Sequence, residues 1–195
     1  LRASEIRALF SVVSRPEVVS LAGGMPNLKD LPLDKLAASA EKLIRNHGAQ
    51  AMQYGSGQGW EMLRERITEV MTYDGIVGAD PDDVVVTTGS QQALDLVTEL
   101  FVNPGDVILA EAPSYVGALG VFRARQADIV HVPMDEHGII PEALEETIRD
   151  VRSSGRTIKF IYIIPNYHNP AGVTLSAERR PIIAEICLRE HVLIV

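Results

Sequence analysis

Residues 162–172, YIIPNYHNPAG, run from an apolar segment into two asparagines, two prolines and a glycine, and the last four of them, Asn-Pro-Ala-Gly, could line a binding site. An asparagine side chain offers a donor and an acceptor, so a loop at the end of a strand would present both from a rigid mount. Pro170 also permits a cis peptide bond, which would aim Asn169 inward. The same residues suit a plain proline-stopped strand before a helix, so this motif alone leaves both interpretations open.

A second candidate site lies at residues 87–92, Thr-Thr-Gly-Ser-Gln-Gln, between an expected strand and an expected helix. The start of a helix offers unpaired N–H groups and a partial positive charge, which suit a phosphate. Gly89 would let the backbone approach the ligand, and the Ser90 hydroxyl would add a donor. A plain N-cap would use the same residues. The loop has no lysine, which excludes a nucleoside-triphosphate P-loop.

Other site chemistries find little support in the sequence. The five histidines are scattered, and none has a metal-ligand spacing to another or to Cys187. There is no G-x-S-x-G nucleophile elbow. Residues 54–59, Tyr-Gly-Ser-Gly-Gln-Gly, depart from the G-x-G-x-x-G spacing of a dinucleotide loop, and no apolar strand precedes them. Metal hydrolases, serine hydrolases and dinucleotide enzymes are therefore disfavoured, and Tyr54 is the residue of interest in that loop.

The elements that must position these residues alternate between strands and helices from residue 83 onward. Apolar and β-branched runs predict strands over residues 83–88, 107–110, 128–132, 157–164 and 191–195. Helical spacing of apolar residues predicts helices over residues 90–101, from about 114, and over 141–151 and 176–190. Because the strands are apolar on both faces, we expect an α/β fold with a mostly parallel sheet and helices on both of its faces.

Before residue 83 the sequence predicts an N-terminal arm and two helices. Apolar residues recur at helical spacing from Leu36 to Ile44 and again from Trp60 to Val70. The glycine-rich residues 54–59 join these two stretches. We therefore expect the sheet to be preceded by an arm and helices.

A parallel sheet binds ligands outside the carboxyl ends of its strands. Three of the segments that follow expected strands carry residues suited to chemistry, at residues 88–91, 111–115 and 164–172. We therefore expect both candidate motifs, together with Tyr115, to gather at one edge of the sheet.

Composition and charge exclude several classes of protein. Hydrophobic residues make up 46% of the chain and charged residues 23%, which is average for a soluble globular protein and excludes wholesale disorder. The net charge of −8 and the lack of a basic stripe predict no nucleic-acid partner. The apolar stretches are too short to span a membrane. With one cysteine, Cys187, and no secretory signal, we expect a cytoplasmic location.

Taken in order, five motifs resemble the N-terminal half of a fold-type I, pyridoxal-phosphate-dependent aminotransferase of class I/II. The nearest subgroup contains the 2-aminoadipate and kynurenine aminotransferases. The motifs are SLAGGMPN (20–27), QYGSGQGWEMLRERI (53–67), VVVTTGSQQALDL (84–96), PGDVILAEAPSYVGAL (104–119) and IPNYHNPAG (164–172). The resemblance implies pyridoxal 5'-phosphate as the cofactor. It also implies an N-terminal arm and small-domain helix over residues 1–46 and a partial cofactor-binding large domain over 47–195.

The resemblance assigns roles to individual residues of the cofactor site. It implies that Ser90 and Gln91, preceded by Gly89, hold the cofactor phosphate at the helix N-terminus. Tyr115 is similar to the residue that stacks on the pyridine ring. Asn169 is similar to the residue that binds the phenolic oxygen of the ring.

Three further positions resemble residues that meet the substrate or a second subunit. Tyr54 is similar to the tyrosine that reaches the phosphate of the neighbouring subunit, which implies a homodimer. Gly24 resembles the glycine beside the substrate, where Asn169 also lies. Arg7 matches an arginine that can meet a side-chain carboxylate of the substrate, and it equally suits a solvated helix position.

The activity implied is amino-group exchange between an amino acid and a 2-oxo acid, commonly 2-oxoglutarate. The sequence departs from the family in three respects. The lysines present, Lys29, Lys35, Lys42 and Lys159, lie outside any Ser-x-x-Lys context. The sequence also offers no match to the aspartate that pairs with the pyridine nitrogen or to the arginine that binds the substrate carboxylate. We therefore expect this chain to be the N-terminal part of a larger enzyme, to lack the covalent lysine and to be inactive alone. A cofactor-binding effector domain of a transcription regulator, a carbon–sulfur lyase and a non-catalytic scaffold are the alternative interpretations.

Overall fold

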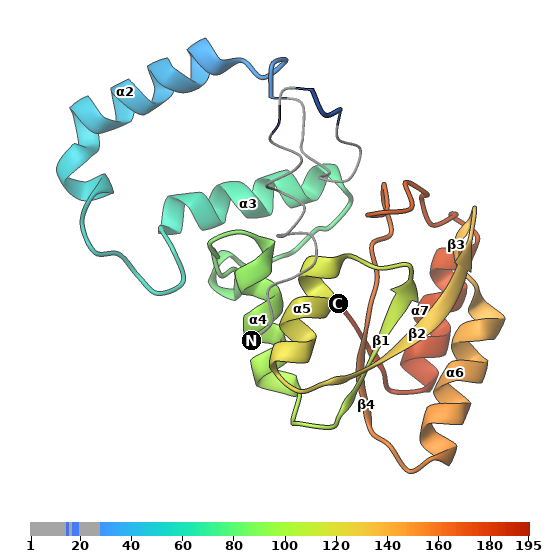
Figure 1. Cartoon of the computed structure of the whole chain (residues 1–195). Coiled ribbons are helices and arrows are strands. Elements are labelled where there is room, and N and C mark those ends of the chain that lie inside the picture. Colours follow the sequence, from blue (N-terminus) through green and yellow to red (C-terminus); the bar gives the residue numbers. More distant parts are fainter. Residues whose placement is uncertain (1–14, 16, 20–27) are drawn as a thin grey trace. The chain divides into compact units, whose positions relative to one another are not determined.

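The computed structural model describes residues 15, 17–19 and 28–195. Contacts within the chain divide it into two compact units, with the boundary between Thr88 and Gly89 (Figure 1). We call residues 28–88 the helical unit and residues 89–195 the sheet unit.

The helical unit contains α2 (Leu33–Ala51), α3 (Glu61–Tyr73) and the 3-10 helix η1 (Pro81–Asp83). The two helices expected from apolar spacing are therefore present. Arg64 of α3 is buried, and its Nη1 donates to the Pro81 carbonyl at 2.7 Å and to Asp82 Oδ1 at 3.0 Å. These bonds join α3 to η1.

The strand expected over residues 83–88 does not form, and the prediction is wrong there. Val84 has extended backbone angles, φ −94° and ψ 128°, but the segment belongs to no strand. The Val86 N–H donates to the Gln58 carbonyl at 2.8 Å. A β-branched run favours extended backbone, whereas a strand also needs a neighbouring strand to pair with. The partner of Val86 is Gln58, which lies in a loop and not in a strand.

The sheet unit contains the other expected strands and helices, with some ends shifted by a few residues. Its strands are β1 (Val107–Ala112), β2 (Asp128–Asp135), β3 (Gly138–Ile139), β4 (Ile158–Tyr162) and β5 (Leu193–Ile194). Its helices are α4 (Ser90–Phe101), α5 (Val116–Ala124), α6 (Pro141–Ser153) and α7 (Arg179–Arg189). The strand order is β3-β2-β1-β4-β5, and all pairs are parallel except β2 with β3. The expected α/β fold with a mostly parallel sheet is confirmed.

Alternate residues of β1 pack on opposite faces of the sheet, which explains why its sequence is apolar throughout. Val107 and Leu109 belong to a core cluster with residues of α6 and α7. Ile108 and Ala110 belong to a second cluster with residues of α4 and α5. In that second cluster, the Phe122 ring meets the Phe160 ring edge-on, with ring centroids 5.6 Å apart. The helices therefore cover both faces of the sheet, as expected (Figure 1).

The connections on either side of β1 run in opposite directions. β1 leads through α5 to β2 on one side, whereas β4, on its other side, leads through α7 to β5. Such a reversal opens a crevice between the carboxyl ends of the two central strands. The segments after β1 and β4 therefore border the expected ligand site.

The short strand β3 has no counterpart in the sequence prediction. Its pairing with β2 involves Met134 with Ile139 and Asp135 with Gly138. Gly138 has φ +92°, and a Cβ there would lie 3.0 Å from the Leu175 Cα. A two-residue strand is too short to show alternation in the sequence, and the glycine alone indicates only a turn.

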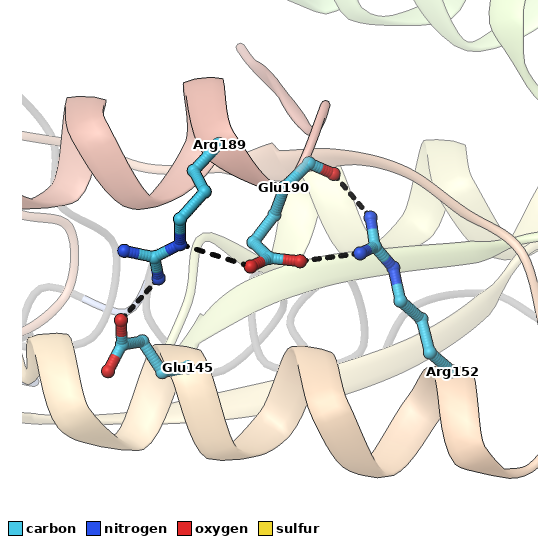
Figure 2. Close-up of polar contacts among 4 residues, drawn as sticks. All are labelled: Glu145, Arg152, Arg189 and Glu190. Atoms are coloured by element: carbon cyan, nitrogen blue, oxygen red, sulfur yellow. Dashed lines mark hydrogen bonds and ion pairs between the residues drawn. The ribbon is translucent and has the colours of Figure 1, made fainter.

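Four charged residues join α6 to the C-terminal end of α7 (Figure 2). Glu190, the C-cap of α7, lies between two arginines: Arg152 Nη1 donates to its Oε2 at 2.5 Å, and Arg189 Nε donates to its Oε1 at 3.2 Å. Arg152 also donates to the Glu190 carbonyl, and Arg189 donates to Glu145 of α6. The network fastens these two helices on one face of the sheet.

Candidate active site

The first candidate motif forms the start of α4. Gly89 holds the N-cap position with φ +78°, a backbone conformation that glycine adopts readily and other residues rarely do. Ser90 is the first helical residue, so the interpretation of Ser90 as a plain N-cap is wrong. Ser90 and Gln91 are both exposed at the first turn, which holds no acidic residue. The N–H groups at the start of a helix point toward its N-terminus and suit an anion.

Tyr115 lies next to this helix start. It is the N-cap of α5, is partly buried and packs against the core cluster beneath α4 and α5. Its ring lies against Gly117, where an added Cβ would be 2.4 Å from the tyrosine Cζ. Gln91 Nε2 donates to the Gly117 carbonyl at 3.5 Å. The structure therefore brings Gln91 and Tyr115 together at the adjoining starts of two helices.

The second candidate motif lies in the loop after β4, residues 163–175, which we call the β4 loop. Three backbone hydrogen bonds close it: Leu175 N–H to the Pro165 carbonyl at 2.9 Å, His168 N–H to Val173 at 2.8 Å and Gly172 N–H to His168 at 2.6 Å. Asn169 lies near the tip and is exposed. The Asn169–Pro170 bond is cis, as the sequence permits. Because β4 is parallel to β1, the β4 loop and Tyr115 follow the same edge of the sheet.

A buried glutamate and histidine lie beneath this edge. Glu111 in β1 is 1% exposed and His168 in the β4 loop is 2% exposed. Glu111 Oε2 accepts the Ile164 N–H at 2.8 Å and lies 3.0 Å from His168 Nε2. His168 Nδ1 accepts the Ala171 N–H at 3.2 Å, so the proton of the neutral ring belongs on Nε2. Nε2 lies off the line of a hydrogen bond to Glu111 and has no other partner among the described residues.

Burial controls the protonation of this pair. It raises the pKa of Glu111 from 4.5 to about 7, against the opposing effect of the Ile164 N–H. Burial also lowers the pKa of His168. Both shifts have the same physical origin, because an apolar surrounding disfavours the charged form of either group. The sequence did not predict that Glu111 and His168 form a buried pair. The one available signal was that Glu111 continues the apolar run of β1.

Arg180 of α7 holds the opposite side of the β4 loop. Its Nη2 donates to Asn166 Oδ1 at 2.7 Å, and its Nε donates to the Leu175 carbonyl at 3.1 Å. The loop is therefore fixed from β1 through Glu111 and from α7 through Arg180. Its tip, with Asn169, is exposed at the carboxyl edge of the sheet.

Ser114 adds an unpartnered polar atom next to Tyr115. The residue is 6% exposed, and its Oγ makes no hydrogen bond within the described part of the chain. Buried hydroxyls nearly always have a partner. Its position just after β1 therefore indicates a place where a polar ligand or water completes the site.

The remaining predicted site residues lie elsewhere. Tyr54 belongs to the helical unit, where it is fully exposed. It lines an open groove of about 830 Å³, together with Trp60 and Arg64. Gly24 and Arg7 lie outside the described residues.

The described residues give no sign of a metal centre or of a membrane span. No group of three or more histidine, cysteine, aspartate or glutamate side chains among them could hold a metal ion. None of the helices within residues 28–195 is both long and apolar enough to cross a bilayer.

Comparison with known proteins identifies the family. Residues 16–195 match the family model described as aminotransferase class I and II. The chain is 37% identical to aromatic-amino-acid aminotransferase 1 of Thermococcus litoralis, over all of this chain and 47% of that protein. The structure of kynurenine aminotransferase from Pyrococcus horikoshii, in complex with PMP and kynurenine, superposes with a TM-score of 0.92 at 35% identity, over 100% of this chain and 48% of that one.

A third relative carries a ligand derived from pyridoxal phosphate. α-Aminoadipate aminotransferase of Thermus thermophilus, complexed with N-(5'-phosphopyridoxyl)-L-leucine, has a TM-score of 0.84 at 33% identity, over 99% of this chain and 46% of that one. The chain belongs to the aminotransferase class I and II family. It spans about half the length of the curated relatives it matches.

Proposed function

We propose that the protein carrying this chain is an aminotransferase that moves an amino group from an amino acid to a 2-oxo acid, with 2-oxoglutarate as the acceptor. The proposal is carried by one observation: the start of α4, Tyr115 and the loop of Asn169 share the carboxyl edge of the sheet. Pyridoxal phosphate is the implied cofactor, because the family uses it and the Thermus thermophilus relative binds a pyridoxal derivative.

The residues at this edge fit a flat ring that bears a phosphate. The first-turn N–H groups of α4, the Ser90 hydroxyl and the Gln91 amide are donors suited to a phosphate. Tyr115 offers an aromatic face suited to stacking on a ring. The Ser114 Oγ, which has no hydrogen-bond partner among the described residues, leaves hydrogen-bonding capacity for a polar ligand at the same edge.

In this proposal each residue has a defined task. Gly89 lets the phosphate approach the backbone, while Ser90 and Gln91 donate hydrogen bonds to it. Tyr115 fixes the plane of the ring and excludes water from one of its faces. Asn169 donates its amide hydrogen bond to the phenolic oxygen of the ring. When bound, the cofactor supplies the electron sink that amino-group transfer requires.

We propose that none of the lysines in this chain binds the cofactor covalently. Lys159 Nζ lies 3.3 Å from Asp106 Oδ2, at the amino ends of β4 and β1 and hence at the edge opposite the crevice. Lys35 and Lys42 belong to α2, and Lys29 precedes it. Borohydride reduction of the protein with pyridoxal phosphate, followed by peptide mass spectrometry, tests this: a reduced adduct on any of the four contradicts it.

The quaternary and substrate assignments belong to the same proposal. Full exposure of Tyr54 supports the assignment to the phosphate site of a second subunit in a homodimer. Gly24 and Arg7 remain proposed contacts to the substrate, and residues 1–46 and 47–195 remain the proposed domains.

The cytoplasm is the proposed location, supported by the single buried cysteine, Cys187.

The decisive experiment is a titration of the whole protein with pyridoxal phosphate, followed by absorbance. We expect Asn169→Ala and Ser90→Ala to weaken binding about tenfold each, or about 1.4 kcal/mol. Asn103→Ala is the matched control, because Asn103 is exposed in the turn that precedes β1. Glutamate formation from 2-oxoglutarate and a panel of amino donors then tests the reaction. Wild-type protein that neither binds the cofactor nor forms glutamate overturns the proposal.

A further inference from the structure

We propose that Glu111 and His168 are positioning residues that set the loop carrying Asn169, so that Glu111 acts on the cofactor site through Asn169. The inference rests on the proposed function, because Asn169 is the residue proposed to meet the cofactor. Neither member of the pair is exposed enough to reach a ligand in the crevice, since they are 1% and 2% exposed. Their effect on the site must therefore pass through neighbouring residues.

The first step of the argument is the base of the β4 loop. Ile164 is the second residue after β4, and its N–H donates to Glu111 Oε2 at 2.8 Å. This N–H lies beyond the last pair of the β1–β4 ladder, which ends at Ala110 with Tyr162. The carboxylate thus replaces the missing strand partner and fixes where the loop leaves the sheet.

The second step is the interior of the loop. The His168 ring accepts the Ala171 N–H through Nδ1 at 3.2 Å, and its Nε2 lies 3.0 Å from Glu111 Oε2. The His168 carbonyl also accepts the Gly172 N–H at 2.6 Å. Asn169 thus lies between His168 and Ala171, two residues joined by the histidine ring. The ring in turn lies against the glutamate that fixes the base.

The third step is the cost of placing a carboxyl group here. Glu111 is the one acidic side chain among the buried residues of the described chain. Removing a carboxylate from water costs free energy, and a neutral residue at this position would not have that cost. One oxygen of this carboxyl group accepts the Ile164 N–H at 2.8 Å and lies 3.0 Å from His168 Nε2, whereas an apolar residue offers no acceptor at this position.

A double-mutant cycle on pyridoxal phosphate affinity tests whether Glu111 acts through Asn169. In the whole protein, we expect Glu111→Ala to weaken binding about tenfold, as is usual for residues that orient a binding group. Because the two residues act in series, adding Glu111→Ala to Asn169→Ala should cost little more than Asn169→Ala alone. A double variant weakened about a hundredfold, the product of the two single effects, would overturn the inference.

The conservative variant separates positioning from a general loss of structure. Glu111→Gln keeps an acceptor oxygen for the Ile164 N–H, so we expect it to restore binding to within about twofold of wild type. If Glu111→Ala fails to fold, this variant still decides the matter. An affinity loss in Glu111→Gln as large as that in Asn169→Ala would contradict a hydrogen-bonding role.

A readout without cofactor completes the test. We expect amide hydrogen exchange at Ile164 and Ala171 to be slow in wild type and in Glu111→Gln. His131→Gln is the matched control, because His131 Nδ1 lies 3.2 Å from the Glu111 carbonyl and not from its carboxylate. Its affinity for pyridoxal phosphate and its amide exchange should stay as in wild type.

The two proposals fail in different ways. Wild-type protein that does not bind pyridoxal phosphate would overturn the proposed function. Wild-type protein that binds it, with additive effects of Glu111→Ala and Asn169→Ala in the double-mutant cycle, would overturn this inference alone.

Discussion

Arg179 donates two parallel hydrogen bonds to Asp135, from Nη1 to Oδ1 at 2.6 Å and from Nη2 to Oδ2 at 2.8 Å. The same Nη1 donates to the Gly138 carbonyl at 2.9 Å. One side chain at the start of α7 therefore holds both the end of β2 and the first residue of β3. Such a two-pronged pair depends on the planar guanidinium and is lost with lysine.

We expect Arg179→Lys to lower the melting temperature by a few degrees near neutral pH. Hydrogen bonds from Arg179 lower the pKa of Asp135 from 3.8 to about 2. This stabilisation is present above the unfolded value and is lost as pH falls through about 2. Thermal unfolding of the variant and wild type at several pH values checks the prediction. A gap in melting temperature that stays constant down to that pH would contradict it.

Glu111 should make stability depend on pH in the opposite direction. Burial raises its pKa from 4.5 to about 7, so between these values the folded chain keeps a proton that the unfolded chain releases. The free energy of unfolding therefore falls as pH rises through this window, by on the order of 3 kcal/mol. We expect Glu111→Gln to lose this dependence, so that its stability relative to wild type rises from about pH 5 to about pH 7.5.

Urea unfolding at several pH values measures this difference. His168 opposes Glu111, because burial lowers its pKa below 6.5 and its stabilisation is lost as pH falls. Both proteins keep His168, so subtracting their unfolding free energies isolates the glutamate. A difference between Glu111→Gln and wild type that does not vary with pH would show that Glu111 is ionised in the folded chain throughout.

Gly117→Ala should displace Tyr115. The added methyl group would lie 2.4 Å from the tyrosine ring, so the ring must leave its position. We expect cofactor affinity to fall about tenfold while the fold is kept, because stacking is lost and the core is not. Gly120→Ala is the matched control, because Gly120 lies in the same helix and the added Cβ would meet no atom of the described residues within 4 Å beyond its chain neighbours and the nearby helix backbone. That variant should be more stable by about 0.5–1 kcal/mol and bind as wild type.

The network between α6 and α7 should depend on Glu190 more than on Glu145. Glu190 accepts from both Arg152 and Arg189, whereas the one donor to Glu145 among the described residues is Arg189 (Figure 2). We expect Glu190→Gln to lower the melting temperature by a few degrees and Glu145→Gln by less. At about 1 M salt the two values should converge, because screening weakens exposed charge pairs. Equal melting temperatures at low salt would contradict the ranking.

Much of the sheet unit could be predicted because its strands are apolar on both faces. Ile108 and Leu109 pack on opposite faces, and that burial is visible in the sequence as an unbroken apolar run. The carboxyl edge followed from the parallel order, so Tyr115 and Asn169 could be assigned to it in advance. The family followed from five ordered motifs, and the family match confirms it.

The rest depends on partners that no local pattern reveals. Val84 has the residue type of a strand, but pairing is decided by a neighbour far away in the chain. Glu111 belongs to β1 and His168 to the β4 loop, so their contact forms only once β1 and β4 are adjacent. The N-cap of α4 is Gly89 and not Ser90, because Gly89 has a positive φ. The residue types alone do not predict that angle.

The buried carboxyl group of Glu111 also bears on how the central strand finds its place. A slip of one residue would turn every side chain of β1 to the opposite face. Glu111 would then lie on the side of Phe122 and Phe160, away from the Ile164 N–H. A misplaced apolar residue costs little in a strand that is apolar on both sides, whereas a misplaced glutamate is strongly penalised. Glu111 thus gives an otherwise uniform strand one correct alignment.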